Sequence, residues 1–152
     1  MNQDVKDYFG DIVKLSQVFE KLGYPCEIHP PATEQEIAGW EKEIGHSLPS
    51  DYRDLLKLSK YIYMNRGFVQ LHEPVLCGEN EICIGLVIGD GDDYYYHFEN
   101  RQFYREFEGE INLFDSFSGL LDNVYCELEM SLDSEFGDRW TAIYDELFPD
   151  GD

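Results

Sequence analysis

The chain has 152 residues, of which 43% are hydrophobic and 15% aromatic, so it can bury a core and does not have the composition of a disordered acidic tail. Its charge is far from balanced: 32 acidic residues face 11 Lys and Arg, which gives a net charge of -21. Such a field repels phosphates and anionic membranes and attracts basic proteins, which argues against direct binding to nucleic acid or to a membrane.

Neither a secretory signal nor a membrane span is predicted. Asp4, Asp7 and Asp11 occupy the region where a signal peptide needs a basic start and an unbroken apolar run. No stretch reaches the roughly 18 apolar residues of a membrane span. We therefore expect a cytoplasmic protein. Its cysteines form no CxxC pair and no metal-type spacing with histidine, so we expect free thiols at Cys26, Cys77, Cys83 and Cys126.

The first third of the chain is predicted to be mostly helical. Apolar residues at three- and four-residue steps predict an amphipathic helix over residues 4–22, and residues 24–29 predict a short edge strand. Thr33 and Glu36 form a capping-box pattern that starts a second helix, and Gly45 suits its left-handed end. A third helix then follows Pro49 and runs to about residue 60.

The rest of the chain changes from a period of 3.6 to a period of two. Strands are predicted at residues 68–71, 81–88, 93–98 and 102–107, with residues 73–80 as a loop because of Pro74. A turn is predicted at residues 89–92. A helix capped by Asp115 or Ser116 extends to about residue 128, a linker covers 131–137, and a last helix covers about 138–148.

This order of elements predicts one α+β domain over residues 1–152. We expect an antiparallel sheet of about four to six strands with helices packed mainly on one face. The core of the domain should lie at about residues 30–130, with one additional helix at each end.

Motifs for catalysis are absent from the sequence. It contains no GxSxG, no GxxxxGK[ST] and no HExxH pattern, and its four histidines fall in different predicted elements. With 32 acidic residues, carboxylate pairs arise by chance and do not indicate acid–base catalysis. We therefore expect a protein that is not an enzyme, with no metal and no cofactor.

The helix–loop–helix at residues 32–58 and the segments after it resemble a known family, the SUKH superfamily of Smi/Knr-like proteins. The resemblance rests on the Leu-Pro corner, on the run GDGDDYYY at residues 89–96 and on SFSGLLDNV at residues 116–124. Its signature positions here are Trp40, Glu41, Gly45, Leu48, Pro49 and Tyr52. The resemblance implies a structural role for Glu41, which would accept hydrogen bonds from backbone N–H groups of the Leu-Pro loop. The usual Asn-Gly after the second corner helix is missing here.

The resemblance also implies a function. Bacterial members are mostly immunity proteins that bind and block secreted toxins, many of them nucleases, and fungal relatives regulate cell-wall synthesis through protein contacts. We therefore expect a protein that binds a cognate toxin, a basic nuclease-type protein, and occludes it. The alternative is a regulatory or scaffold module whose partner is not a toxin.

Aromatic and acidic residues gather in and after the predicted hairpin, a combination that suits a basic protein partner. The candidate partner-binding residues are Asp90, Asp92, Asp93, Tyr94, Tyr96, Glu99, Glu106 and Glu108. The alternative is that two of the three consecutive tyrosines pack into the core and that the acidic residues only maintain solubility.

Overall fold

The computed structural model describes residues 1–87 and 92–150. Within these residues, seven strands pair antiparallel with their neighbours in chain order and form one meandering sheet. The strands are β1 (Glu27–Ile28), β2 (Ile62–Met64), β3 (Val69–Gly78), β4 (Glu81–Val87), β5 (Asp93–His97), β6 (Gln102–Phe107) and β7 (Glu110–Phe114). Strands β1 and β7 are therefore the two edges of the sheet.

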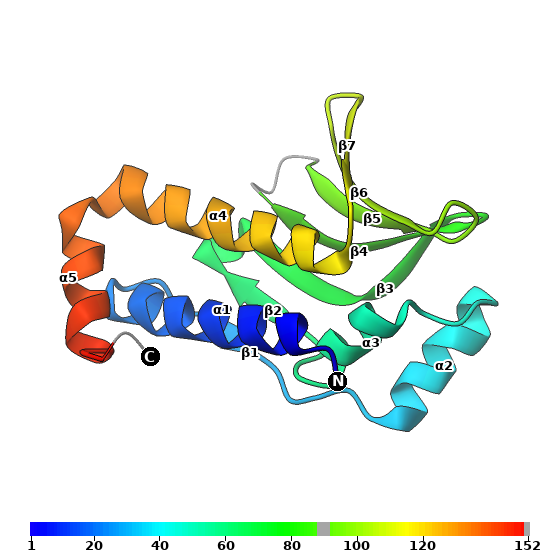
Figure 1. Ribbon diagram of the computed structural model, residues 1–152, viewed down its shortest axis with the longest axis horizontal. Helices are drawn as coiled ribbons and strands as arrows, with labels where there is room; N and C mark the ends of the chain where they lie inside the picture. Colours follow the sequence, from blue (N-terminus) through cyan, green and yellow to red (C-terminus); the bar gives the residue numbers. More distant parts are fainter. Residues whose placement is uncertain (88–91, 151–152) are drawn as a thin grey trace.

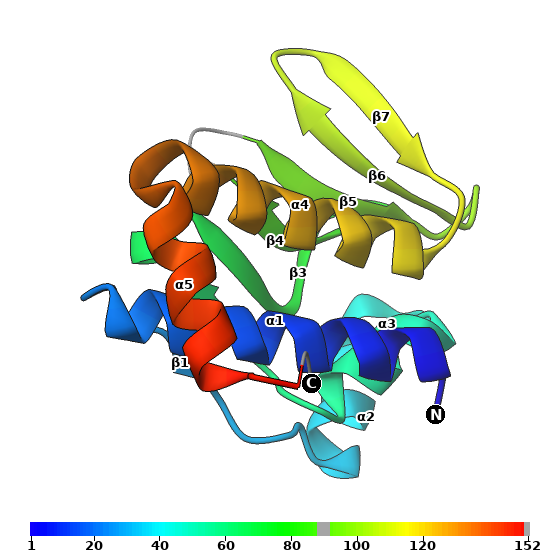
Figure 2. The same cartoon turned by 60° about the vertical axis from the view of Figure 1, so that its left-hand side comes forward.

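Five helices accompany the sheet in the described chain: α1 (Gln3–Lys21), α2 (Glu34–Ile44), α3 (Ser50–Leu56), α4 (Phe117–Phe136) and α5 (Asp138–Leu147). A short 3₁₀ turn, η1 (Asn65–Gly67), joins β2 to β3. Helices α1 and α4 run side by side, and α5 crosses one end of the pair (Figure 1). In a second view, the hairpin of β6 and β7 projects beyond α4 (Figure 2). None of the helices in the described chain has the length and apolar character needed to span a bilayer.

The hydrophobic core lies between the helices and one face of the sheet. Helix α1 contributes Val5, Ile12, Leu15, Val18 and Phe19, each at most 1% exposed. Burial alternates along β5, where Tyr94 and Tyr96 are buried and their neighbours are partly exposed. Among the described elements, no helix packs on the other face of the sheet. The predicted α+β class is confirmed, but the sheet has seven strands rather than four to six.

Two predictions about the elements were wrong. The predicted loop at residues 73–80 is largely strand, since β3 passes through Pro74 to Gly78. Pro74 is accommodated because the register between β3 and β4 shifts between Leu71 and Val75, where the ladder is interrupted. The predicted linker at residues 131–137 is helical to Phe136, since Leu132 continues the buried stripe of α4. Two further strands, β2 and β7, were not predicted.

The corner between α2 and α3 has the geometry that its sequence predicts. Thr33 and Glu36 form a capping box, and Gly45 ends α2 with a φ of 83°. The carboxylate of Glu41 accepts a hydrogen bond from the backbone N–H of Leu48 at 2.6 Å, the role that the resemblance implies. Leu48 and Tyr52 are buried, whereas Trp40 is only partly buried against the core. The remaining signature residue, Pro49, is the N-cap of α3.

Candidate partner-binding surface

The two faces of β5 and β6 carry opposite kinds of polar residue, because successive side chains of a strand point to opposite sides. On the core side, Tyr94 pairs in register with Arg105. On the other side, Asp93 pairs with Glu106, so two carboxylates lie on directly opposed residues of neighbouring strands. Asp92, one residue before β5, is 1% exposed and belongs with the core-side groups.

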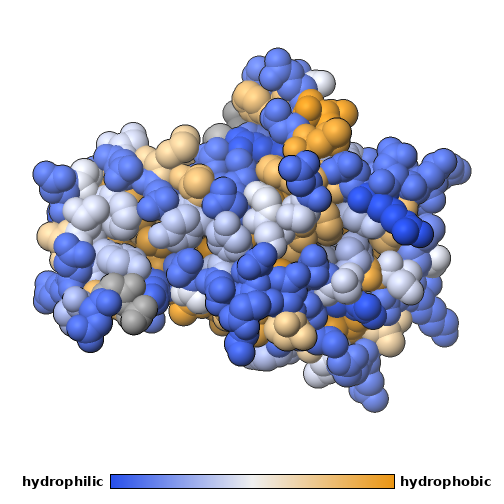
Figure 3. Space-filling model, viewed as in Figure 1, coloured by the Kyte–Doolittle hydropathy of each residue, from blue (hydrophilic) through white to orange (hydrophobic). Residues whose placement is uncertain are grey.

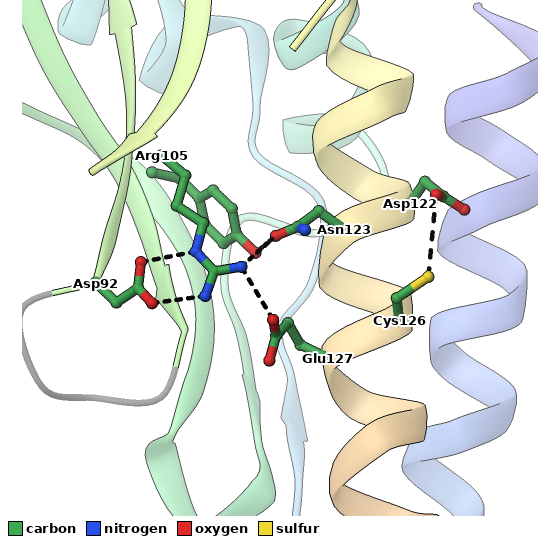
Figure 4. Close-up of polar contacts among 7 residues, drawn as sticks. Asp92, Arg105, Asp122, Asn123, Cys126 and Glu127 are labelled. Atoms are coloured by element: carbon green, nitrogen blue, oxygen red, sulfur yellow. Dashed lines mark hydrogen bonds and ion pairs between the residues drawn. The ribbon is translucent and has the colours of Figure 1, made fainter. Parts of the chain in front are cut away.

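Arg105 is the centre of a polar network between the sheet and α4 (Figure 4). Its guanidinium donates to both carboxylate oxygens of Asp92, from Nε at 2.7 Å and from Nη2 at 2.6 Å. Nη1 donates to Oδ1 of Asn123 at 2.9 Å and to Oε1 of Glu127 at 3.0 Å. The hydrogen bonds to Asp92 raise the pKa of Arg105 above its ordinary value, so the guanidinium stays charged.

Tyr94 completes this network from β5. Its hydroxyl donates to Oδ1 of Asn123 at 2.7 Å. Burial raises the pKa of Tyr94, which keeps the hydroxyl protonated and able to donate. All of these groups are used to hold α4 against the sheet, so the network is structural.

The uncovered side of β5, β6 and β7 forms a continuous surface, which we call the acidic open face. One row across the strands consists of Asp93, Glu106 and Ile111, and the next consists of Tyr95, Tyr104 and Leu113. The rings of Tyr95 and Tyr104 stack with centroids 5.2 Å apart, and the Tyr104 hydroxyl donates to Glu81. Burial and that hydrogen bond raise the pKa of Tyr104.

Apolar side chains border the acidic open face along β7. Ile111 is 57% exposed and Leu113 is 65% exposed. Figure 3 shows apolar surface gathered on the projecting hairpin of β6 and β7, among hydrophilic surroundings. A shallow hollow of about 360 Å³ lies beside it, lined among others by Glu81, Tyr104 and Leu113. An exposed apolar patch with polar residues around it is typical of a protein-binding surface.

Comparison with known protein families identifies the family of this chain. The model of the SMI1 / KNR4 family (SUKH-1) matches residues 31–145, which cover both corner helices, strands β2 to β7 and most of α5. The chain belongs to the SUKH-1 family. No curated protein matches the sequence. Helix α1 lies outside the matched region of this SUKH-1 protein, yet it supplies a large part of the core.

The eight residues predicted to bind a partner are not all on the surface of the SUKH-1 fold. Tyr94 and Tyr96 are 0% and 8% exposed, and Asp92 is buried against Arg105, so the expectation that these three face a partner is corrected. Period-two alternation allowed either one or two of the three tyrosines to point inward, and two do. Asp90 lies outside the described residues.

The remaining four predicted residues are accessible but do not form one cluster. Asp93 and Glu106 are neighbours on the acidic open face, and Glu108 follows in the exposed turn between β6 and β7. Glu99 is exposed in the turn at the opposite end of β6. Sequence reasoning missed Tyr95, Ile111 and Leu113, although alternation in EINLF at residues 110–114 was a usable signal.

A cysteine–histidine contact also lies on the uncovered side of the SUKH-1 sheet. Sγ of Cys83 is 3.9 Å from Nε2 of His72. Burial raises the pKa of Cys83, which is the opposite of the shift that activates a nucleophilic thiol. The described residues contain no group of three side chains placed to hold a metal ion. All four cysteines lie in the described chain and are free, as predicted.

Proposed function

We propose that this SUKH-1 protein is an immunity protein. It binds a cognate toxin with a basic surface, of the nuclease type, in the cytoplasm and occludes it without any chemical reaction. The observation that carries the proposal is the acidic open face, where Asp93 lies opposite Glu106 beside the exposed Ile111 and Leu113. Membership of the SUKH-1 family supports the proposal.

The two kinds of residue on this face have different tasks in binding. Directly opposed carboxylates repel each other and lower the stability of a sheet slightly. A basic partner would remove this repulsion. A net charge of -21 also accelerates encounter with a positively charged protein, since long-range attraction steers association. The exposed apolar side chains then supply contact area that remains in place when salt screens the charges.

Co-expression tests the proposal directly. The protein encoded immediately upstream of this chain is expressed alone and together with it, and cell survival and co-purification are measured. Protection together with a stable complex supports immunity. Absence of protection and of a complex contradicts the proposal. A stable complex with a non-toxic partner favours the regulatory or scaffold module instead.

Charge reversal on the acidic open face tests which surface is used. The pair Asp93→Lys and Glu106→Lys is compared with Asp145→Lys and Glu146→Lys, which change the net charge equally on exposed positions of α5. We expect association with the toxin to slow by about tenfold or more for the first pair only. Equal effects of both pairs would show that total charge matters and that this face does not.

A further inference from the structure

The outer edge of β7 is unusually open to strand pairing. In the described sheet β7 pairs only with β6, and its first four residues are exposed. Edge strands are commonly protected by Lys, by Pro or by bulges, but EINLF contains neither residue and pairs with β6 without a register shift. The opposite edge, β1, has only two residues.

The turn that precedes β7 determines which backbone groups are free. Glu108 and Gly109 have φ values of 51° and 85°, so they form a two-residue turn of type I′ between the paired Phe107 and Glu110. In such a hairpin the residues that flank the turn exchange hydrogen bonds, and alternate residues of β7 then do the same with β6. The backbone groups of Glu110, Asn112 and Phe114 therefore face β6.

The side chain of Gln102 supports this assignment. It donates from Nε2 to the backbone carbonyl of Phe114 at 2.5 Å, which places that carbonyl on the β6 side. It follows that the N–H and C=O groups of Ile111 and Leu113 face outward from the edge. The same two residues carry the exposed side chains of the acidic open face.

Charge decides which chain fits this edge. A strand added to β7 places alternate side chains on the acidic open face, with Glu106 on the second strand inward and Asp93 on the third. Since neighbouring strands lie about 4.8 Å apart, Lys or Arg side chains of the added strand can reach across Ile111 toward Glu106. A second copy of this chain would instead bring together two molecules that each carry a net charge of -21.

We infer that β7 receives an extended, basic segment of the toxin as an additional strand, so that the partner's backbone pairs with Ile111 and Leu113 while its Lys or Arg side chains lie on the acidic open face. The inference rests on the proposed immunity function and specifies how the partner is held. Backbone hydrogen bonds from an added strand provide affinity, and the alternate side chains provide specificity.

Residue-resolved amide hydrogen exchange tests the inference. Exchange is measured by NMR for this protein alone and in complex with the protein encoded upstream. We expect the amides of Ile111 and Leu113 to exchange rapidly in the free protein and at least about tenfold more slowly in the complex, because each then donates to the added strand. The amides of Asn112 and Phe114 already face β6 and should change much less.

Two substitutions at Leu113 separate the backbone from the side chain. Leu113→Ala removes the apolar side chain but keeps the N–H, whereas Leu113→Pro removes the N–H as well. Proline is tolerable here because this N–H faces away from β6, and thermal unfolding of both variants checks that they fold. We expect Leu113→Pro to bind about tenfold more weakly than Leu113→Ala.

Each outcome has a distinct meaning. A complex in which Ile111 and Leu113 exchange as freely as in the free protein overturns strand addition and leaves the immunity function standing. Absence of any complex overturns both. Protection of these amides that depends on protein concentration, without the partner, assigns the edge to a second copy and also overturns the inference.

Discussion

On one face of strands β5 and β6 the acidic side chains are paired with a cation, and on the other face they are not, although the positions are one residue apart. On the core side, Asp92 and Glu127 both pair with the guanidinium of Arg105, whose side chain is 14% exposed. On the open side, Asp93 and Glu106 are opposed in register, and no Lys or Arg of the described chain forms an ion pair with either of them. The core-side charges hold α4 to the sheet, and the open-side charges are not compensated by a cation of the described chain.

This difference shows that a count of acidic residues says little about their roles in this chain. Asp92 and Asp93 are identical in type and adjacent in sequence, but only the first has its charge compensated inside the protein. Substitutions on the two sides should therefore separate stability from binding.

The largest effect on stability is expected from Arg105→Leu. This change leaves the carboxylates of Asp92 and Glu127 without their cation in a mostly buried site, so the free energy of unfolding should fall by about 3–5 kcal/mol. Urea denaturation measures it. Adding Asp92→Leu should restore part of the loss because the uncompensated charge is removed. A loss below 1 kcal/mol for Arg105→Leu would contradict the structural role of the network.

A smaller effect is expected at the corner, from Glu41→Gln. The amide oxygen can still accept from the N–H of Leu48, but a neutral acceptor forms a weaker hydrogen bond than a carboxylate. We expect a loss of about 1 kcal/mol in the free energy of unfolding. Glu43→Gln, at an exposed position of the same helix, is the matched control and should have no measurable effect. Equal effects of the two would mean that Glu41 acts only through net charge.

The corner was predictable from sequence because its signals are local. A capping box spans four residues, and a glycine in the left-handed conformation is needed where α2 ends. Strand β7 was missed because the turn that joins it to β6 consists of Glu108 and Gly109. A glutamate at positive φ is an uncommon turn residue, so EG is a weaker hairpin signal than NG or DG.

The candidate surface was only partly predictable for a different reason. Alternation in DYYYH indicates that adjacent tyrosines face opposite ways, but it does not say which way Tyr94 points. On the core side the Tyr94 hydroxyl donates to Asn123, which lies 29 residues away on α4 and also accepts from Arg105 of the neighbouring strand. Long-range partners of this kind leave no local pattern in the sequence.

A gain in stability is expected when the open-side charges are neutralised. Asp93→Asn with Glu106→Gln removes the repulsion between two directly opposed carboxylates, so the free energy of unfolding should rise by about 0.2–1 kcal/mol. Urea denaturation at low salt measures the change, and high salt should reduce it. The same double variant should associate more slowly with the partner that the proposed function requires. Loss of stability would show that these carboxylates serve the fold.

The smallest effect is expected from Glu36→Gln in the capping box, and it depends on pH. The hydrogen bond from the backbone N–H of Thr33, aided by Lys60, lowers the pKa of Glu36 below its ordinary value of 4.5. A carboxylate with a lowered pKa in the folded state stabilises the fold above its unfolded pKa and loses that contribution as pH falls through the folded value. The protein should therefore be slightly more stable than Glu36→Gln at neutral pH. The difference should shrink as pH falls below 4.5 and vanish once Glu36 is protonated in the folded state as well.

Urea midpoints at neutral pH and in acid measure this difference, with Glu43→Gln as the control on the same helix. Glutamine can itself complete a capping box, so the variant keeps the helix start and changes only the charge. A difference that persists in acid would show that the amide disturbs the geometry of the cap. A difference that vanishes would show that an outward carboxylate can also serve the fold when it has a backbone donor, which Asp93 and Glu106 lack in the described contacts.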